Sequence, residues 1–132
     1  MSKIKIEQSL QNLGNALKRL KEALEVEENE LVIDATIQRF EFVIELFWKT
    51  LKRILEAEGI HAKTPKETLK SAYAAEWIHD ETAWLQMLHD RNETSHVYDE
   101  KKAQEIYEHI RLYFPVLCEA YDFLSHKPIQ VQ

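Results

Sequence analysis

The chain has 132 residues, of which 45% are hydrophobic and 30% are charged, so it is long enough to bury a core and polar enough to cover it. Two glycines and three prolines are few for a turn-rich all-β fold, and a single cysteine excludes both an internal disulfide framework and Cys-rich zinc sites. The formal net charge of −6 argues against a general nucleic-acid coat. Any contact with RNA therefore has to come from a local basic site.

The N-terminal residues and the apolar runs of the sequence indicate where in the cell the protein is expected. The first residues mix Lys and Glu with Ile and contain no apolar signal-peptide core. No apolar run approaches the roughly 20 residues of a membrane span. With one cysteine and no membrane segment, we expect a protein of the reducing cytoplasm.

Helical periodicity dominates the sequence, because apolar residues recur at steps of three and four. The predicted helices cover about residues 3–26, 31–58, 65–75, a segment that follows a cap at Asp80 or Thr82, and 99–126. Thr64 and Glu67 predict a capping box around Pro65, Gly59 suits a helix end, and Asp99 suits a start. We therefore expect an all-α fold, an up-and-down bundle of four main helices plus a short one, with residues 1–126 as a single domain and 127–132 as a loose tail.

The second predicted helix is apolar around most of its circumference. Phe42, Val43 and Leu46 widen its main stripe and leave only a narrow polar line. Such a helix is either central in a monomeric bundle or also covered by a second copy of the chain. The sequence leaves both alternatives open, and the second predicts a homodimer.

The residues richest in chemistry lie between the last two long helical patterns, where Arg91, Asn92, His96 and Tyr98 fall within eight positions. A fixed cation, an amide and an imidazole are suited to handling a phosphate. On an unbroken helix, Arg91 and His96 would diverge by about 140°. The two meet at one phosphate only if the helix ends near Thr94 or if two copies come together.

Metal-free RNA cleavage is the reaction that suits these residues. The ribose 2′-hydroxyl attacks the adjacent phosphate, His96 moves a proton, Arg91 stabilises the charge on the phosphoryl oxygens, and Asn92 orients. A plainer interpretation is that Arg91 and His96 cap carbonyls or pair with a neighbouring carboxylate such as Asp90 or Glu93. The other histidines and carboxylates lack metal-ligand spacing, so we expect no metal and no cofactor.

The motif Arg91-Asn92-x-x-x-His96-x-Tyr98 resembles the Arg-x4-His-x-Tyr motif of the HEPN (higher eukaryotes and prokaryotes nucleotide-binding) superfamily. The surrounding block 84–100, together with Phe40-Glu41-Phe42 and Pro65-Lys66-Glu67, resembles its branch of nucleotidyltransferase substrate-binding proteins. This resemblance covers nearly the whole chain. It implies the HEPN helical bundle, which is related to the helical domain of kanamycin nucleotidyltransferase.

The same resemblance implies a function. The protein would be a homodimer with its motifs at the dimer cleft, and Arg91, Asn92 and His96 would cut RNA. A partner nucleotidyltransferase would silence this toxin by transferring AMP to Tyr98. Two other classes remain open, a non-catalytic subunit that binds substrate or nucleotide for a two-component nucleotidyltransferase and a plain helical interaction module.

Overall fold

The computed structural model describes residues 3–94 and 99–129, which form five helices and no strand. The helices are α1 (Lys3–Leu24), α2 (Glu30–Ala57), α3 (Pro65–Ala74), α4 (Glu81–Glu93) and α5 (Glu100–His126). The predicted all-α class is confirmed, and the predicted helices agree closely with these bounds. None of the five combines the length and the apolar character needed to cross a bilayer.

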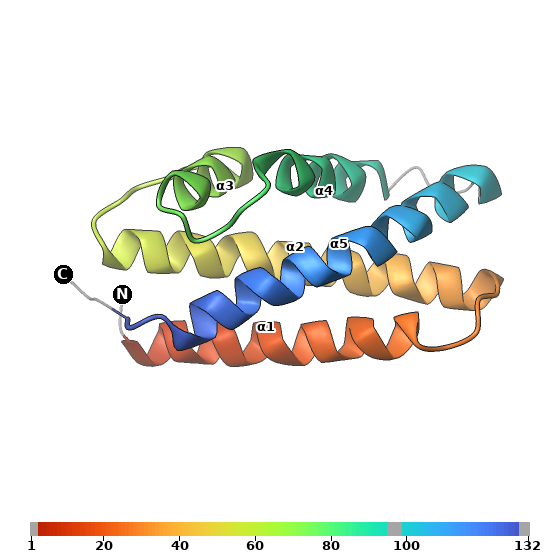
Figure 1. Ribbon diagram of the computed structural model, residues 1–132, viewed down its shortest axis with the longest axis horizontal. Coiled ribbons are helices and arrows are strands. Elements are labelled where there is room, and N and C mark those ends of the chain that lie inside the picture. Colours follow the sequence, from red (N-terminus) through yellow and green to blue (C-terminus); the bar gives the residue numbers. More distant parts are fainter. Residues whose placement is uncertain (1–2, 95–98, 130–132) are drawn as a thin grey trace.

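The two N-terminal helices, α1 and α2, run antiparallel, as Figure 1 shows. Along the other side of α2, α3 and α4 follow one another, and α5 crosses the bundle diagonally back toward the N-terminus (Figure 1). All four other helices pack against α2. Every helix contributes to the buried core, for example through the fully buried Leu13, Phe47, Ala72, Met87 and Ile110. The second predicted helix is therefore central in the bundle, and its coverage by a second copy stays a prediction.

The helix ends are closed by the residues that the sequence suggested. Thr64 accepts a hydrogen bond from the backbone N–H of Glu67 at 3.1 Å, and the Glu67 carboxylate accepts one from Lys63 at 2.9 Å. This return bond reaches the residue before the cap, one position earlier than in the predicted capping box. Asp80 and Asp99 cap α4 and α5.

Gly59 ends α2 with a φ of 84°, a left-handed conformation that favours glycine. The N–H of Ile60 reaches back to the carbonyl of Leu55 at 2.9 Å, which satisfies one of the last carbonyls of the helix. The chain can therefore turn sharply from α2 into the segment that leads to α3.

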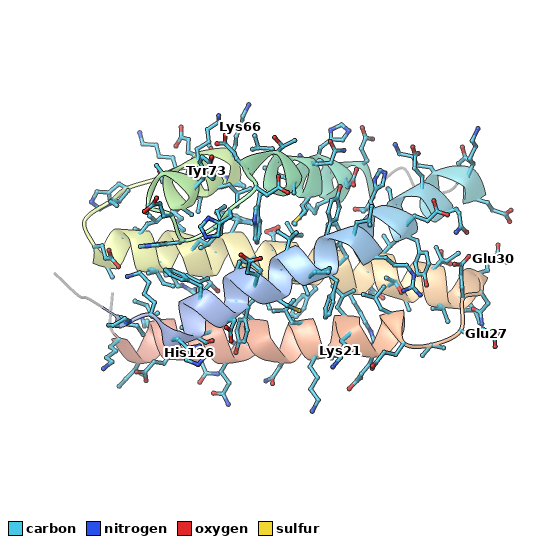
Figure 2. The ribbon with its side chains drawn as sticks, in the orientation of Figure 1. Lys21, Glu27, Glu30, Lys66, Tyr73 and His126 are labelled. Atoms are coloured by element: carbon cyan, nitrogen blue, oxygen red, sulfur yellow. The ribbon has the colours of Figure 1, made fainter. Side chains whose placement is uncertain are left out.

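Polar side chains cover the outside of the bundle. Lys21 on α1 and Lys66 on α3 point away from it in Figure 2. Beyond α5, Lys127 lies 2.5 Å from the Glu58 carboxylate and 4.8 Å from the centre of the Trp77 ring. Two large apolar side chains of α2, Leu31 and Phe42, stay exposed, at 80% and 56%.

Candidate functional site

The C-terminal end of α4 carries the first half of the predicted motif. The helix ends at Glu93, and Thr94 closes it by donating a hydrogen bond from its hydroxyl to the carbonyl of Arg91 at 2.7 Å. The helix therefore ends before His96, as the motif requires for Arg91 and His96 to act on one phosphate within a single copy. His96 and Tyr98 themselves lie outside the described residues.

Arg91 is held by a carboxylate of the central helix. Its Nη2 donates to Oε1 of Glu45 at 2.8 Å, and the two side chains are 37% and 32% exposed. Lys49 lies 3.6 Å from the other oxygen of the same carboxylate. The carboxylate that pairs with Arg91 is therefore neither of the sequence neighbours Asp90 and Glu93. One edge of the guanidinium is fixed by Glu45, and the site gains a residue from α2.

The Arg91–Glu45 pair lines a groove of about 490 Å³. The groove runs along the exposed side of α2, and its other polar or aromatic walls are Arg19 of α1 and Gln38, Arg39, Glu41 and Phe42 of α2. Its volume is in the range of small-molecule and cofactor sites, about 300–1,000 Å³. The site is thus larger than the motif and extends over three helices.

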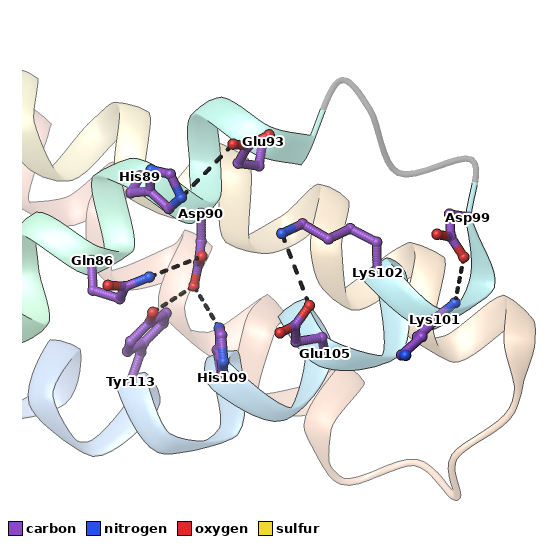
Figure 3. Close-up of polar contacts among 10 residues, drawn as sticks. All are labelled: Gln86, His89, Asp90, Glu93, Asp99, Lys101, Lys102, Glu105, His109 and Tyr113. Carbon is purple, nitrogen blue, oxygen red and sulfur yellow. Dashed lines mark hydrogen bonds and ion pairs between the residues drawn. The ribbon is translucent and has the colours of Figure 1, made fainter.

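Asp90, the residue before Arg91, faces a different helix. Asp90 is 2% exposed, and its Oδ2 accepts a hydrogen bond from the Tyr113 hydroxyl at 2.5 Å and contacts Nδ1 of His109 at 2.9 Å. Gln86 adds a longer contact of 3.4 Å to the other oxygen (Figure 3). Asp90 is the one buried charged side chain among the residues that the structure describes. It therefore pins α4 to α5.

The phenol of Tyr113 is a permanent donor in this cluster. Burial, the hydrogen bond to Asp90 and the negative charge of Asp90 all raise the pKa of Tyr113 well above its usual value of 10. The hydroxyl consequently keeps its proton throughout the physiological pH range. A buried carboxylate needs such donors, because an unpaired one would be costly to bury.

The remaining candidate residues have simpler surroundings. Asn92 is exposed on α4, and His89 lies on the surface 3.8 Å from Glu93. Within residues 3–94 and 99–129, no three His, Cys, Asp or Glu side chains cluster closely enough to hold a metal ion. Cys118 is half-buried, and burial raises the pKa of its thiol.

Sequence reasoning missed the residues that surround the motif. Glu45 belonged to the narrow polar line of α2, which indicated a solvated stripe and nothing more specific. Arg19 lies next to Lys18 and close to Lys21 on α1, and such a run of basic residues is typical of a solvated helix face. The signal that could have singled out Glu45 is its place where Phe42 and Leu46 widen the apolar stripe and narrow the polar line of α2.

Comparison with known proteins places this architecture in a family. The model of the family described as "Nucleotidyltransferase substrate binding protein like" matches residues 8–126. The chain belongs to this family. The resemblance to the nucleotidyltransferase substrate-binding branch of the HEPN superfamily is thereby confirmed. A family-level association with nucleotidyltransferases comes with this membership.

A sequence relative gives a more specific comparison. The protein named "Probable ribonuclease HepT" from Haemophilus influenzae (strain ATCC 51907 / DSM 11121 / KW20 / Rd) is 37% identical over 86 residues. This match covers 61% of the chain and 59% of the relative, so the two are aligned over less than two thirds of either protein.

Two solved structures share the fold. A protein from Thermus thermophilus is 33% identical and superimposes with a TM-score of 0.80 over 85% of this chain and 98% of that one. A second structure, from Haemophilus influenzae, is described as revealing the fold of a substrate-binding domain of a nucleotidyltransferase. It is 27% identical and superimposes with a TM-score of 0.80 over 89% of this chain and 99% of that one. The five-helix arrangement is therefore the fold of this family.

Proposed function

We propose that the protein is a metal-independent endoribonuclease in which Arg91, Asn92 and His96 act on the scissile phosphate. The observation that carries the proposal is the position of Arg91. It is held by Glu45 at 2.8 Å beside a groove of nucleotide size, and α4 ends just before His96. The relative named as a probable ribonuclease supports the same reaction class.

The proposed reaction is an internal phosphoryl transfer. The 2′-oxygen forms a bond to phosphorus as the bond to the 5′-oxygen breaks, which leaves a cyclic phosphate and a 5′-hydroxyl. His96 takes the proton from the 2′-hydroxyl or gives one to the leaving oxygen, while Arg91 stabilises the charge on the phosphoryl oxygens. Asn92 holds the substrate or the imidazole. A second copy of the chain would supply the second imidazole of an acid–base pair.

The proposal extends to assembly and control. We infer a homodimer, built from a single domain over residues 1–126, that acts in the cytoplasm as the toxin of a toxin–antitoxin pair. A partner nucleotidyltransferase, in keeping with the family, would neutralise it by transferring AMP to Tyr98. Adding a charged group two residues from His96 would block the approach of an RNA phosphate by like-charge repulsion.

A second candidate function has its own support. The Haemophilus influenzae structure is described as a substrate-binding domain of a nucleotidyltransferase, and the groove volume of about 490 Å³ suits a nucleotide. In this alternative the chain binds the nucleotide or acceptor for a separate nucleotidyltransferase and cuts nothing. It predicts a tight complex and loss of transferase activity when this chain is removed.

The test is RNA cleavage by the purified chain, free of its partner and in chelator. The wild type should cut, His96→Ala should not, and His89→Ala, which changes an exposed histidine of α4, should cut as the wild type does. The rate should also vary with pH near the ordinary histidine pKa of about 6.5. Intact RNA at stoichiometric protein, with a mass that excludes an adduct on Tyr98, would favour the substrate-binding subunit.

A further inference from the structure

We propose that the groove beside Arg91 is a nucleotide subsite, in which Phe42 stacks a base while Arg19 and Arg39 hold a phosphate that is not the one being cut. The inference deepens the proposed function and rests on it in one respect, because Arg91 lines the same groove. The ligand class is a nucleotide unit, supplied either by single-stranded RNA or by a free nucleoside monophosphate.

The aromatic side chain is the first argument. Phe42 lies on the central helix but is 56% exposed, whereas its neighbours Phe40 and Phe47 are fully buried. Its ring lines the groove and leaves a large apolar surface in contact with water. Exposed aromatic rings are the platforms on which proteins stack unpaired bases, and every base has a face that fits. A base on Phe42 would cover this surface.

The arginines are the second argument. Arg19 and Arg39 come from α1 and α2, and Nη1 of Arg39 donates to the backbone carbonyl of Arg19 at 2.5 Å. This bond fixes the Arg39 guanidinium but uses only one of the five N–H donors that an arginine carries. The planar donor set matches the oxygens of a phosphate. The groove thus offers a fixed guanidinium from α2, and Arg19 of α1 lines the same groove.

The local charge is the third argument. The chain as a whole carries −6, yet this groove combines three arginines with two carboxylates, Glu41 and Glu45. One of these carboxylates is already paired with Arg91 at 2.8 Å. The lining therefore carries a formal excess of one positive charge (3 − 2 = +1) on an acidic protein, so the groove can attract a phosphate although the chain as a whole repels it.

The first experiment measures binding of a fluorescent single-stranded oligonucleotide with 2′-O-methyl riboses by anisotropy, in chelator. This ligand cannot be cleaved through a 2′-hydroxyl, so the result does not depend on ribonuclease activity. Phe42→Ala should weaken binding by roughly tenfold, in line with the loss of one stacked base. Phe42→Leu, which keeps the apolar bulk, should weaken it similarly. Phe123→Ala, which removes another exposed phenylalanine, 42% exposed on α5, should leave it unchanged.

The second experiment tests the phosphate contact through salt dependence. Arg19→Gln should lower the slope of log affinity against log salt by about 0.7, the value for one phosphate contact on a single strand. Lys18→Gln removes the same charge from the adjacent exposed position, which is not part of the groove lining, and should leave the slope unchanged. Competition by AMP that is lost in Phe42→Ala would assign the subsite to free nucleotides as well as to RNA.

Several results would overturn the inference. Equal affinities for wild type, Phe42→Ala and Phe42→Leu would show that no base stacks here. A parallel loss in Phe123→Ala or Lys18→Gln would mean that the effects are nonspecific. Unchanged binding with a smaller assembly for Phe42→Ala in sedimentation would show that a second copy of the chain covers this face. Absent RNA cleavage with intact, Phe42-dependent binding would instead refute only the ribonuclease proposal.

Discussion

The buried carboxylate of Asp90 offers the sharpest test of what holds α4 in place. Tyr113→Phe removes a hydroxyl that donates to Asp90 at 2.5 Å, while the ring keeps its stacking against Phe40 at 5.8 Å between centroids. Both partners are almost completely buried, at 7% and 2% exposure. The substitution therefore isolates one hydrogen bond to a buried charge.

The expected cost follows from the kind of bond lost. Hydrogen bonds to charged groups contribute about 1.5–3 kcal/mol, roughly twice a neutral one. His109 still contacts the same carboxylate oxygen at 2.9 Å, so Asp90 is not left without a donor. We therefore expect Tyr113→Phe to lower the free energy of unfolding by about 1.5–3 kcal/mol.

Urea denaturation measures this loss, and the same helix provides a matched control. The hydroxyl of Tyr107 is buried and has no hydrogen-bond partner in the described part of the chain. Tyr107→Phe should accordingly be neutral or stabilising, because it removes a buried polar group that gains nothing. If both substitutions cost the same, the hydroxyl of Tyr113 does not stabilise Asp90 and the reasoning fails.

The pH dependence of stability provides an independent test of the hydrogen bond between Tyr113 and Asp90. The folded-state pKa of Tyr113 is raised above the unfolded value of 10, so its contribution to stability is complete below pH 10 and is lost as the pH rises further. For each pH unit above 10, the free energy of unfolding of the wild type should fall by up to about 1.4 kcal/mol through this tyrosine, and Tyr113→Phe should not show this fall. The two proteins should converge in stability at high pH, and parallel curves would contradict the assignment.

Three further predictions concern other parts of the bundle. Glu45→Gln should lower the free energy of unfolding in urea by at most about 1 kcal/mol, since its pair with Arg91 is partly exposed. If the chain is a ribonuclease, the same substitution should slow RNA cleavage markedly, and an unchanged rate would argue against a role of Glu45 in positioning Arg91. Gly14→Ala should not raise the free energy of unfolding by the usual amount of about 1 kcal/mol for a helix, because an added Cβ would clash with the Tyr121 hydroxyl. In a double-mutant cycle, the same substitution made in a Tyr121→Ala background should give this increase. An equal increase in both backgrounds would refute the clash. Iodoacetamide at neutral pH should modify Cys118 more slowly in the folded protein than in urea, because burial raises the pKa of its thiol; equal rates by mass spectrometry would contradict this.

The local signals in the sequence were sufficient to predict the helices. Apolar spacing marked the buried face of each one, and the caps at Thr64, Asp80 and Asp99 act through side chains within three residues of the backbone groups they bind. The left-handed turn at Gly59 is equally local. Such features depend on near neighbours in the chain, so they can be read from the sequence without knowing the tertiary fold.

The surroundings of the site could not be predicted in this way. Glu45 and Arg91 are 46 positions apart, and Asp90 lies 23 positions from Tyr113. Whether a carboxylate on α2 meets an arginine on α4 depends on how the helices rotate about their axes when they pack. The sequence motif predicted Arg91 as a site residue, but the partners considered for it were Asp90 and Glu93, because sequence alone indicates only which residues are neighbours in the chain.

Two adjacent residues of α4 explain why the arginine is placed where it is. Successive side chains on a helix point about 100° apart, so Asp90 held against α5 turns Arg91 toward α2 and its groove. Rotating α4 to release Arg91 would draw a buried carboxylate away from Tyr113 and His109. The cluster that touches no substrate thus sets the direction of the proposed phosphate-binding group. A Tyr113→Phe protein that stays folded but cuts RNA more slowly would support this coupling. Unchanged cleavage would mean that Glu45 alone orients Arg91.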